Sequence, residues 1–245
     1  MIGLVGGLLL GSLPASSSSG DTDKKQPEGW VIGPFRRPEG VNPVLVPQPT
    51  AFHCPMRKEQ VKWEESDVFN PAATVKDGKI VVLYRAEDNS AQGIGKRTSR
   101  IGYAESKDGM IMKRMDSPVL FPGGDEFEGI ECPGGCEDPR VAMTEEGLYV
   151  MLYTAWNRKT PRLAVATSRD LKHWTKHGLA FEKAYGGRFA RIATKSASVL
   201  TKVKGGKLVI DKVEGKYFMY WGGIRRACRH LRQSDRLVSG VGCEQ

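Results

Sequence analysis

An internal repeat is the feature of this 245-residue sequence that most restricts the folds it can adopt. Three apolar segments rich in β-branched and aromatic residues each follow a turn that contains glycine, at residues 79–85, 148–154 and 216–222. Aligned on Tyr84, Tyr153 and Trp221, they lie 69 and 68 residues apart. Such segments are typical of β-strands, and helical solenoids are excluded because no apolar stripe with a 3.6-residue period persists.

A second element follows each of the first two segments. Residues 100–109 resemble residues 162–171, and the arginines that begin them, Arg100 and Arg162, lie 62 residues apart. A repeat of about 65 residues built from short antiparallel strands is typical of one blade of a β-propeller. The sequence therefore predicts an all-β fold with two full blades and the first strands of a third.

Composition agrees with this fold class and limits the function less sharply. Apolar residues make up 40% of the chain and charged residues 27%, which excludes wholesale disorder, and 29 glycines suit a fold with many turns. The 37 basic and 28 acidic residues give a formal net charge of +9. This charge is compatible with a nucleic-acid binder and with an enzyme that handles anions or sugars.

The two ends of the chain differ from its middle, residues 28–222. Residues 1–27 include an apolar run that is too short to span a membrane and is similar to a secretory signal, although no Lys or Arg precedes it. We therefore expect a periplasmic or secreted protein, with a cytoplasmic one as the alternative. Residues 223–245 hold five arginines and no lysine. They fit a nucleic-acid arm, a solvated tail or a segment foreign to the fold.

Polar residues gather where the predicted strands begin or end, which is where propellers usually hold their sites. Each one alone is explained by a surface ion pair or a turn cap, but their recurrence in successive repeats favours a site. A tryptophan beside asparagine, arginine and carboxylate is typical of sugar binding. The candidates are Asn70, Arg85, Asp88, Arg100, Asp138, Arg140, Trp156, Asn157 and Lys195.

Other kinds of chemistry receive less support from the sequence. The five cysteines do not form the two close pairs of a typical zinc site, so we expect no metal. No serine or cysteine is matched to a histidine base, and all four histidines lie outside the polar clusters. Acid–base chemistry would then fall to carboxylates, as it does in glycosidases.

In these motifs the chain resembles glycoside hydrolase family 130, which comprises β-mannoside phosphorylases and β-1,2-mannosidases with a five-bladed β-propeller. The resemblance covers about residues 40–222 and is most specific at the Glu-Asp-Pro-Arg motif of residues 137–140. The run at residues 63–70 is closer to the β-1,2-mannosidase branch. The other matching segments are 82–88, 98–104, 154–157 and 194–196.

The resemblance implies a role for each candidate residue. Asp138 corresponds to the general acid of the family, which is thought to protonate the glycosidic oxygen through a hydroxyl group of mannose. Six other candidates align with positions that line the sugar subsite or, in phosphorylases, help receive phosphate: Asn70, Arg85, Arg100, Arg140, Asn157 and Lys195. Asp88 and Trp156 are expected to bind the sugar as well. The family inverts configuration: phosphorylases use phosphate as co-substrate, and hydrolases use water activated by glutamates. No other cofactor is expected.

After Gly222 the sequence departs from the family pattern, which continues with two more blades. We therefore expect an incomplete propeller of about three blades that is inactive alone and associates with itself through an open blade edge. The main hypothesis is a β-1,2-mannosidase-like hydrolase, and a β-mannoside phosphorylase or a non-catalytic carbohydrate-binding fragment are the alternatives. The expected partner is a β-mannoside oligosaccharide, with neither nucleic acid nor a membrane span.

Overall fold

The computed structural model describes residues 36–223 and 238–239, and all of its strands lie in the unit formed by residues 38–245. The leader predicted for residues 1–27 lies outside the described residues. So does the arginine-rich segment, apart from Gly223, Val238 and Ser239. Within the described ranges, no helix has the length and apolar character needed to cross a membrane.

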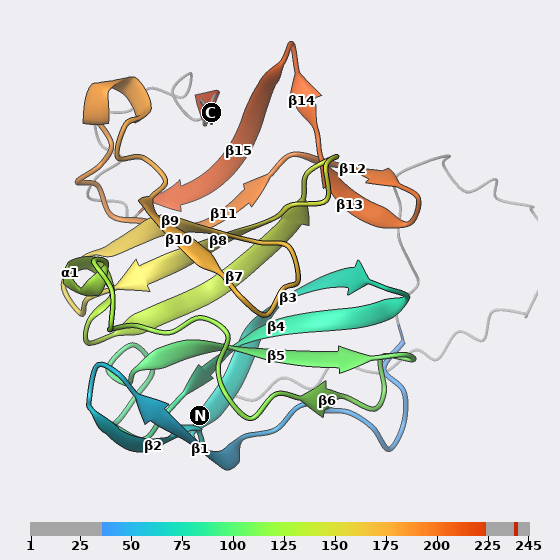
Figure 1. Ribbon diagram of the computed structural model, residues 1–245, viewed down its shortest axis with the longest axis vertical. Coiled ribbons are helices and arrows are strands. Elements are labelled where there is room, and N and C mark those ends of the chain that lie inside the picture. The colour runs from blue at the N-terminus through green and yellow to red at the C-terminus, as the bar shows by residue number, and fades with distance from the viewer. Residues whose placement is uncertain (1–35, 224–237, 240–245) are drawn as a thin grey trace, which may run out of the picture. The chain divides into compact units, whose positions relative to one another are not determined.

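The fold is all-β, as the repeat predicts, and is built mainly from two antiparallel meanders (Figure 1). The first meander consists of β3 (Asp67–Lys76), β4 (Lys79–Glu87), β5 (Ser99–Ser106) and β6 (Lys113–Arg114). The second meander consists of β7 (Gly135–Met143), β8 (Tyr149–Trp156), β9 (Pro161–Ser168) and β10 (Thr175–Leu179).

A third, smaller sheet follows in the sequence. It consists of β11 (Thr194–Val199), β15 (Lys216–Gly223), β14 (Lys212–Val213) and β16 (Val238–Ser239). A hairpin of β12 (Thr201–Lys204) and β13 (Lys207–Ile210) pairs with β7. A hairpin of β1 (Gln48–Cys54) and β2 (Glu59–Glu64) precedes the first meander. The described helices are short: α1 (Glu128–Glu131) and a 3-10 turn at Ala184–Gly187.

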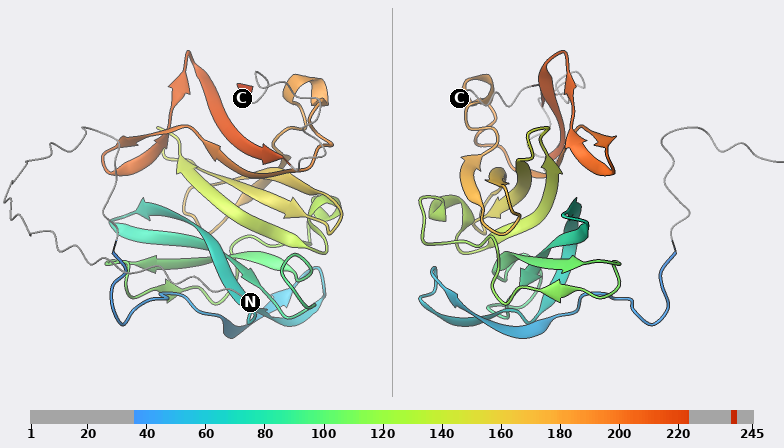
Figure 2. Two further views of the ribbon diagram at one scale, coloured as in Figure 1. Left: turned by 180° about the vertical axis from the view of Figure 1, so that it is seen from behind. Right: turned by 45° about the vertical axis from the view of Figure 1, so that its right-hand side comes forward.

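Both faces of each meander are buried, which explains why the central strands have continuous rather than alternating apolar sequences. Leu83 of β4 packs in one core with Tyr153 of β8, between the two meanders. The next residue along β4, Tyr84, packs with Trp63 of the preceding hairpin. On the other face of β8, Leu152 packs with Met219 of the third sheet. Figure 2 shows the second meander between the first meander and the third sheet.

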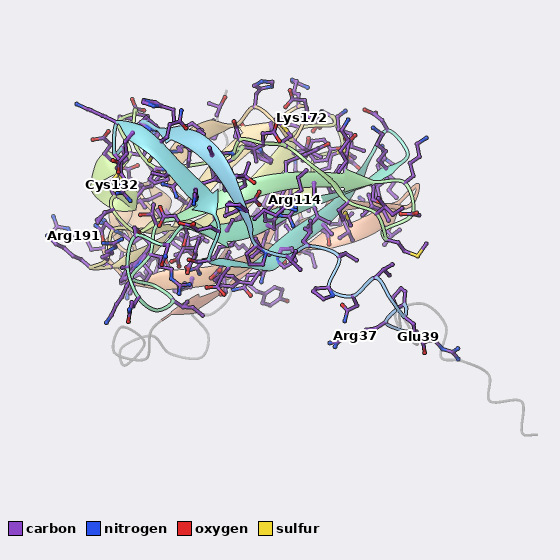
Figure 3. The ribbon with its side chains drawn as sticks, turned by 90° about the horizontal axis from the view of Figure 1, so that it is seen from below. Arg37, Glu39, Arg114, Cys132, Lys172 and Arg191 are labelled. Carbon is purple, nitrogen blue, oxygen red and sulfur yellow. The ribbon has the colours of Figure 1, made fainter. Side chains whose placement is uncertain are left out.

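The β1–β2 hairpin is fixed to the first meander by a buried carboxylate. Glu64 is fully buried and accepts hydrogen bonds from Tyr84 Oη and Arg114 NH1, both at 2.8 Å. Trp63 stacks against the ring of Tyr84 with centroids 6.2 Å apart. Arg114 lies next to the hairpin in Figure 3. These contacts make the hairpin part of the core rather than a loose appendage.

The two meanders meet where β5 and β7 begin. Ser99 and Gly135 pair there in parallel, and the Ser99 amide donates to the Gly134 carbonyl at 2.8 Å. Gly135 has a φ of +105°, and a Cβ at this position would lie 2.0 Å from the Ser99 carbonyl oxygen. Because glycine has no Cβ, the first strand of the second meander, β7, can approach the first meander closely.

Candidate active site

The first strand of each meander and of the third sheet carries a β-bulge near its beginning. In β3, Phe69 pairs with Arg85 and the pairing resumes at Ala72 with Leu83, so two residues lie opposite Tyr84. In the same way, two residues lie opposite one after Glu137 in β7 and after Lys195 in β11. A bulge bends its strand and re-aims the side chains beside it.

The bulges confirm the alignment of the repeats. Tyr84, Tyr153 and Trp221 each lie opposite one bulge, at equivalent register positions. The arginines of the second element are also equivalent, since Arg100 pairs with Ala86 and Arg162 with Ala155.

The first residue of each bulge adopts a left-handed backbone conformation. The φ angles are +43° for Asn70, +50° for Asp138 and +54° for Ser196. Residues other than glycine adopt this conformation at a cost, with asparagine and aspartate the most tolerant, and such strained residues cluster at functional sites. Three equivalent strained positions in neighbouring sheets therefore indicate a functional site at this end of the molecule.

Arg85 is the centre of a buried polar cluster at this end. Its NH1 donates to Asp138 Oδ1 at 3.0 Å, and its NH2 donates to Glu87 Oε1 at 2.5 Å and to Glu137 Oε1 at 2.8 Å. Its Nε donates to Ser99 Oγ at 3.1 Å. The guanidinium thus contacts three carboxylates from two meanders, and its planar set of donors suits this arrangement.

Two further side chains hold Asp138. Asn70 Nδ2 donates to Asp138 Oδ1 at 2.9 Å. Lys195 Nζ lies 3.5 Å from Asp138 Oδ2 and 3.0 Å from Glu137 Oε2. The first meander therefore holds one oxygen of Asp138, and the third sheet supplies the cation nearest the other. We call the seven contacting residues the Arg85 cluster: Asn70, Arg85, Glu87, Ser99, Glu137, Asp138 and Lys195.

The two adjacent carboxyls of the cluster shift their pKa values in opposite directions. Burial raises the pKa of Glu137 above its ordinary value, and the charges of Arg85 and Lys195 offset this only in part. Burial acts in the same direction on Asp138, but the hydrogen bond from Asn70 and the charge of Arg85 outweigh it and lower the pKa. Neighbouring carboxyls with diverging pKa values are typical of sites that need an acid and a base.

Part of the cluster is accessible from solvent. Asp138 is 8% exposed, whereas the Lys195 side chain is 36% exposed and Asn70 and Ser196 are exposed. The ring of Phe69 covers Arg85, with the guanidinium carbon 4.6 Å from the ring centroid. A ligand that reaches Asp138 would therefore also meet Asn70 and Lys195.

The structure separates Asp88 and Arg100 from this cluster. Arg100 is 0% exposed; its NH1 donates to Asp88 Oδ2 at 2.9 Å, and its NH2 donates to Cys54 Sγ at 3.2 Å. Neighbouring residues of a strand point to opposite faces, so Arg100 lies on the other face of β5 from Ser99. These contacts place the Asp88–Arg100 pair against the β1–β2 hairpin.

The other three candidates contact backbone carbonyls. Trp156 Nε1 donates to Gly95 at 2.8 Å, and Asn157 Nδ2 donates to Gly129 at 3.0 Å. Arg140 NH1 donates to the carbonyl of the preceding residue at 2.8 Å. Among the described residues, none of these three side chains forms a hydrogen bond or an ion pair with Asp138.

Sequence reasoning did not select three members of the cluster as candidates: Glu87, Ser99 and Glu137. Alternation along β4 places Glu87 on the same face as Arg85, and this signal was available in the sequence. Glu137 stands beside Asp138 in the motif. Ser99 carried no signal, because only the pairing of β5 with β4 and β7 brings it to Arg85 and Glu87.

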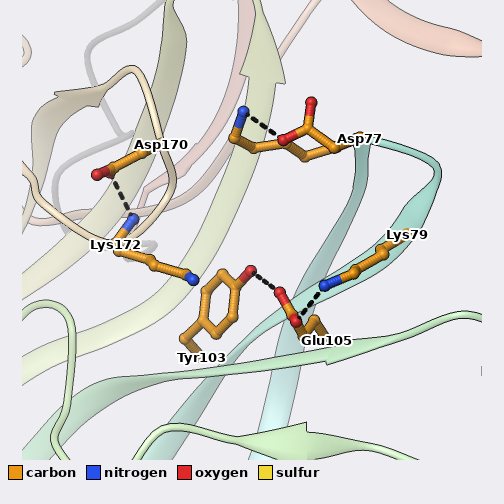
Figure 4. A pocket seen from close by; sticks show the side chains of 7 residues that line it. Asp77, Lys79, Tyr103, Glu105, Asp170 and Lys172 are labelled. Atoms are coloured by element: carbon orange, nitrogen blue, oxygen red, sulfur yellow. Dashed lines mark hydrogen bonds and ion pairs between the residues drawn. The ribbon is translucent and has the colours of Figure 1, made fainter.

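A cavity of about 330 Å³ lies elsewhere, at the opposite ends of the strands (Figure 4). Its lining charges largely satisfy one another: Tyr103 and Lys79 both donate to Glu105, at 2.7 and 2.6 Å, and Lys172 lies over the Tyr103 ring. Among the residues that the structure describes, no group of three or more His, Cys, Asp and Glu side chains could hold a metal ion.

Comparisons with known proteins place this geometry in a family. The family model of glycoside hydrolase family 130, described as β-1,4-mannooligosaccharide phosphorylase, matches residues 41–240. A curated 1,2-β-oligomannan phosphorylase from Thermoanaerobacter sp. (strain X514) is 33% identical over 168 residues, which are 67% of this chain and 49% of that protein. The chain therefore spans about half the length of this curated relative.

Solved structures are more similar still. A structure from Bacteroides ovatus ATCC 8483 is 77% identical with a TM-score of 0.74, and the match covers 79% of this chain and 55% of that one. Another structure, 61% identical with a TM-score of 0.77, covers 80% and 55%. Its description says that glycoside hydrolase family 130, a family of mannoside phosphorylases, contains glycoside hydrolases that target β-1,2 mannosidic linkages in Candida mannan. From the model match and these relatives, the chain belongs to glycoside hydrolase family 130.

Proposed function

We propose that this chain carries part of the sugar site of an inverting enzyme that cleaves β-mannosides, with a β-1,2-mannosidase as the preferred reading. The Arg85 cluster carries the proposal, because it presents one carboxylate, Asp138, at a partly exposed position among donors from the first meander and the third sheet. The 61% identity to a structure described with hydrolases of β-1,2 mannosidic linkages supports the choice of branch.

In the proposed reaction Asp138 is the general acid. Its proton passes through a hydroxyl of the bound mannose to the glycosidic oxygen as the bond to the anomeric carbon breaks. A water molecule attacks that carbon from the opposite face and gives its proton to a carboxylate base, which inverts the configuration. Asn70 and Arg85 fix one oxygen of Asp138, which leaves the other for the sugar. Since the pKa of Asp138 is low without a ligand, burial beneath the sugar has to raise it.

We also propose the finer architecture: each meander is one blade of a five-bladed propeller, and residues 28–222 supply about three blades. Burial of both faces of each meander and the equivalent bulges support this reading. A periplasmic or secreted location and self-association through an open blade edge complete the proposal. Arg140, Trp156 and Asn157 are proposed to line the sugar site, and the buried pair of Asp88 and Arg100 is proposed to support it from the other face of β5.

A β-mannoside phosphorylase is the second candidate. The curated relative named as a 1,2-β-oligomannan phosphorylase favours it, and so does the pair of cations around Asp138, which would suit a phosphate ion. In that case phosphate, rather than water, attacks the anomeric carbon.

The test uses the full 245-residue chain and β-1,2-mannobiose. Calorimetry should detect binding at millimolar sugar, and Lys195→Met should weaken it, whereas Asp211→Asn, which removes a half-buried carboxylate paired with Lys202, should not. Any mannose release should be independent of phosphate and lost in Asp138→Asn.

Three results would change the assignment. Formation of mannose 1-phosphate would replace the hydrolase with the phosphorylase. Binding without any release would favour the non-catalytic carbohydrate-binding alternative. No heat at millimolar sugar would contradict the sugar site itself.

A further inference from the structure

The third bulge contains Ser196, which is neither one of the candidate residues of the sequence motifs nor a member of the Arg85 cluster. Ser196 occupies in β11 the position that Asn70 occupies in β3 and Asp138 in β7. All three have positive φ angles within about ten degrees of one another. Equivalent backbone geometry gives the three side chains equivalent starting directions from their strands.

The first two bulge residues both reach the neighbouring sheet. Asn70 of the first meander contacts Asp138 of the second, and Asp138 in turn lies 3.5 Å from Lys195 of the third sheet. Lys195 directly precedes Ser196. The bulge residues therefore follow one another across the three sheets in the order Asn70, Asp138 and Ser196, and Ser196 belongs to the sheet that contacts Asp138 from the side opposite Asn70.

Serine is a poor choice for this backbone conformation on local grounds. Glycine adopts it freely, and asparagine and aspartate tolerate it better than other residues. Nearby residues of β11 have structural contacts: Ala197 is buried, and Thr194 Oγ1 accepts a hydrogen bond from the Leu163 amide at 2.9 Å. Ser196 itself is exposed, and no hydrogen bond of its hydroxyl is recorded among the described residues.

We propose that the Ser196 hydroxyl binds a hydroxyl group of the mannoside on the Lys195 side of Asp138. This inference rests on the proposed function and deepens it, because it assigns a sugar contact to the flank opposite Asn70. The expected ligand chemistry is a neutral sugar hydroxyl, since serine both donates and accepts and carries no charge. In this arrangement Lys195 forms ion pairs with Asp138 and Glu137, and the Ser196 hydroxyl forms a hydrogen bond with the sugar.

The test compares Ser196→Gly with wild type in the full chain, by calorimetry with β-1,2-mannobiose and by thermal unfolding. Glycine relieves the backbone and removes the hydroxyl, so the melting temperature should stay equal or rise while Kd increases about 3- to 10-fold. Ser196→Asn, which suits the same backbone and restores a polar group, should recover part of the affinity. A merely structural role for Ser196 predicts no loss of affinity in the glycine variant.

A matched control is Glu214→Gly in the turn between β14 and β15. Glu214 is exposed and has a φ of +51°, so glycine should relieve the backbone there too, with Kd unchanged. If wild type and Asn70→Ala differ in affinity but Ser196→Gly equals wild type within 2-fold, the Ser196 proposal is wrong and the sugar site stands. If wild type does not bind at millimolar sugar, the proposed function fails and the Ser196 contact fails with it.

Discussion

The first and second meanders share a backbone and differ in chemistry. In each one, the residue before the bulge pairs with the residue that follows the central aromatic, and an alanine of the second strand pairs with an arginine of the third. At the first of these positions the first meander has Phe69 opposite Arg85, and the second has Glu137 opposite Thr154. The two meanders therefore match residue by residue in their strand pairing.

The difference lies in the charge that equivalent positions carry. The second meander supplies the adjacent carboxylates Glu137 and Asp138, whereas the first supplies the cation Arg85 that contacts both. Neither meander forms this charge arrangement alone, and it arises only where the two meet. The repeat therefore provides the geometry, and the departures from the repeat provide the site.

The largest expected effect concerns the junction between the meanders. Gly135→Ala adds a Cβ 2.0 Å from the Ser99 carbonyl at a φ of +105°, so strain and overlap should together cost more than about 4 kcal/mol. Gly147→Ala, a turn position with a φ of +81° and open space, should cost only about 1 to 2 kcal/mol. Urea unfolding measures both. Equal losses would mean that the close approach of β5 and β7 does not limit this position.

The next effect compares Arg85 directly with its equivalent, Thr154. Arg85→Met leaves Glu87, Glu137 and Asp138 without their shared cation and should cost about 3 to 4 kcal/mol. Thr154→Val should change stability by less than about 1 kcal/mol, because the buried Thr154 Oγ1 has no hydrogen-bond partner among the described residues. Urea unfolding of the two variants at one pH measures the difference. If the two variants lost similar amounts of stability, Arg85 would not be the residue that holds the three carboxylates together.

The smallest expected effect is a difference between Glu137 and Asp138 in how each makes the stability of the fold depend on pH. A carboxyl whose pKa is lower in the folded chain stabilises the fold above its unfolded pKa, and this stability is lost as pH falls through the folded pKa. Asp138 behaves in this way, below about pH 4. The raised pKa of Glu137 has the opposite sign: stability is lost as pH rises from about 4.5 through its folded pKa.

Substitution of each carboxyl by its amide should therefore change the pH dependence in different windows. Asp138→Asn should flatten the gain in stability between pH 3 and about 5, and Glu137→Gln should remove a loss above about pH 4.5. The measurement is the free energy of unfolding in urea from pH 3 to 7. If both variants changed the same window in the same direction, the opposite pKa shifts would be wrong.

Much of the fold could be predicted because strands leave a strong signal in apolar sequence. The positions of Tyr84, Tyr153 and Trp221 predicted the repeat, and their places opposite the bulges confirm it. The bulges themselves were harder to foresee, because Asn-Pro and Asp-Pro also read as ordinary turns. Ser196 followed by Ala197 carried no turn signal at all.

The site was only partly accessible to sequence reasoning. Asn70, Arg85, Asp138 and Lys195 were selected as candidates and lie in one cluster, while their roles stay predictions. Arg100 was selected on the same grounds and lies on the other face of β5, because an adjacent pair of strand residues splits between two faces. Glu87 and Glu137 were not selected, because the sequence shows that they are charged but not that both are buried beside Arg85.

Deletion of a single residue at a bulge would be more disruptive than deletion in a turn. Each bulge holds one residue more than its partner strand, so both flanks of the strand keep their pairing while the bulge residues are turned out of the regular alternation. Without Pro139, Glu137 would still pair with Thr154 and Arg140 with Leu152, but Asp138 would enter a regular ladder opposite Tyr153 and lose the left-handed backbone that directs its side chain. Length changes among relatives of this chain should therefore fall in the turns, such as the one at Glu146 and Gly147, and spare the beginnings of β3, β7 and β11.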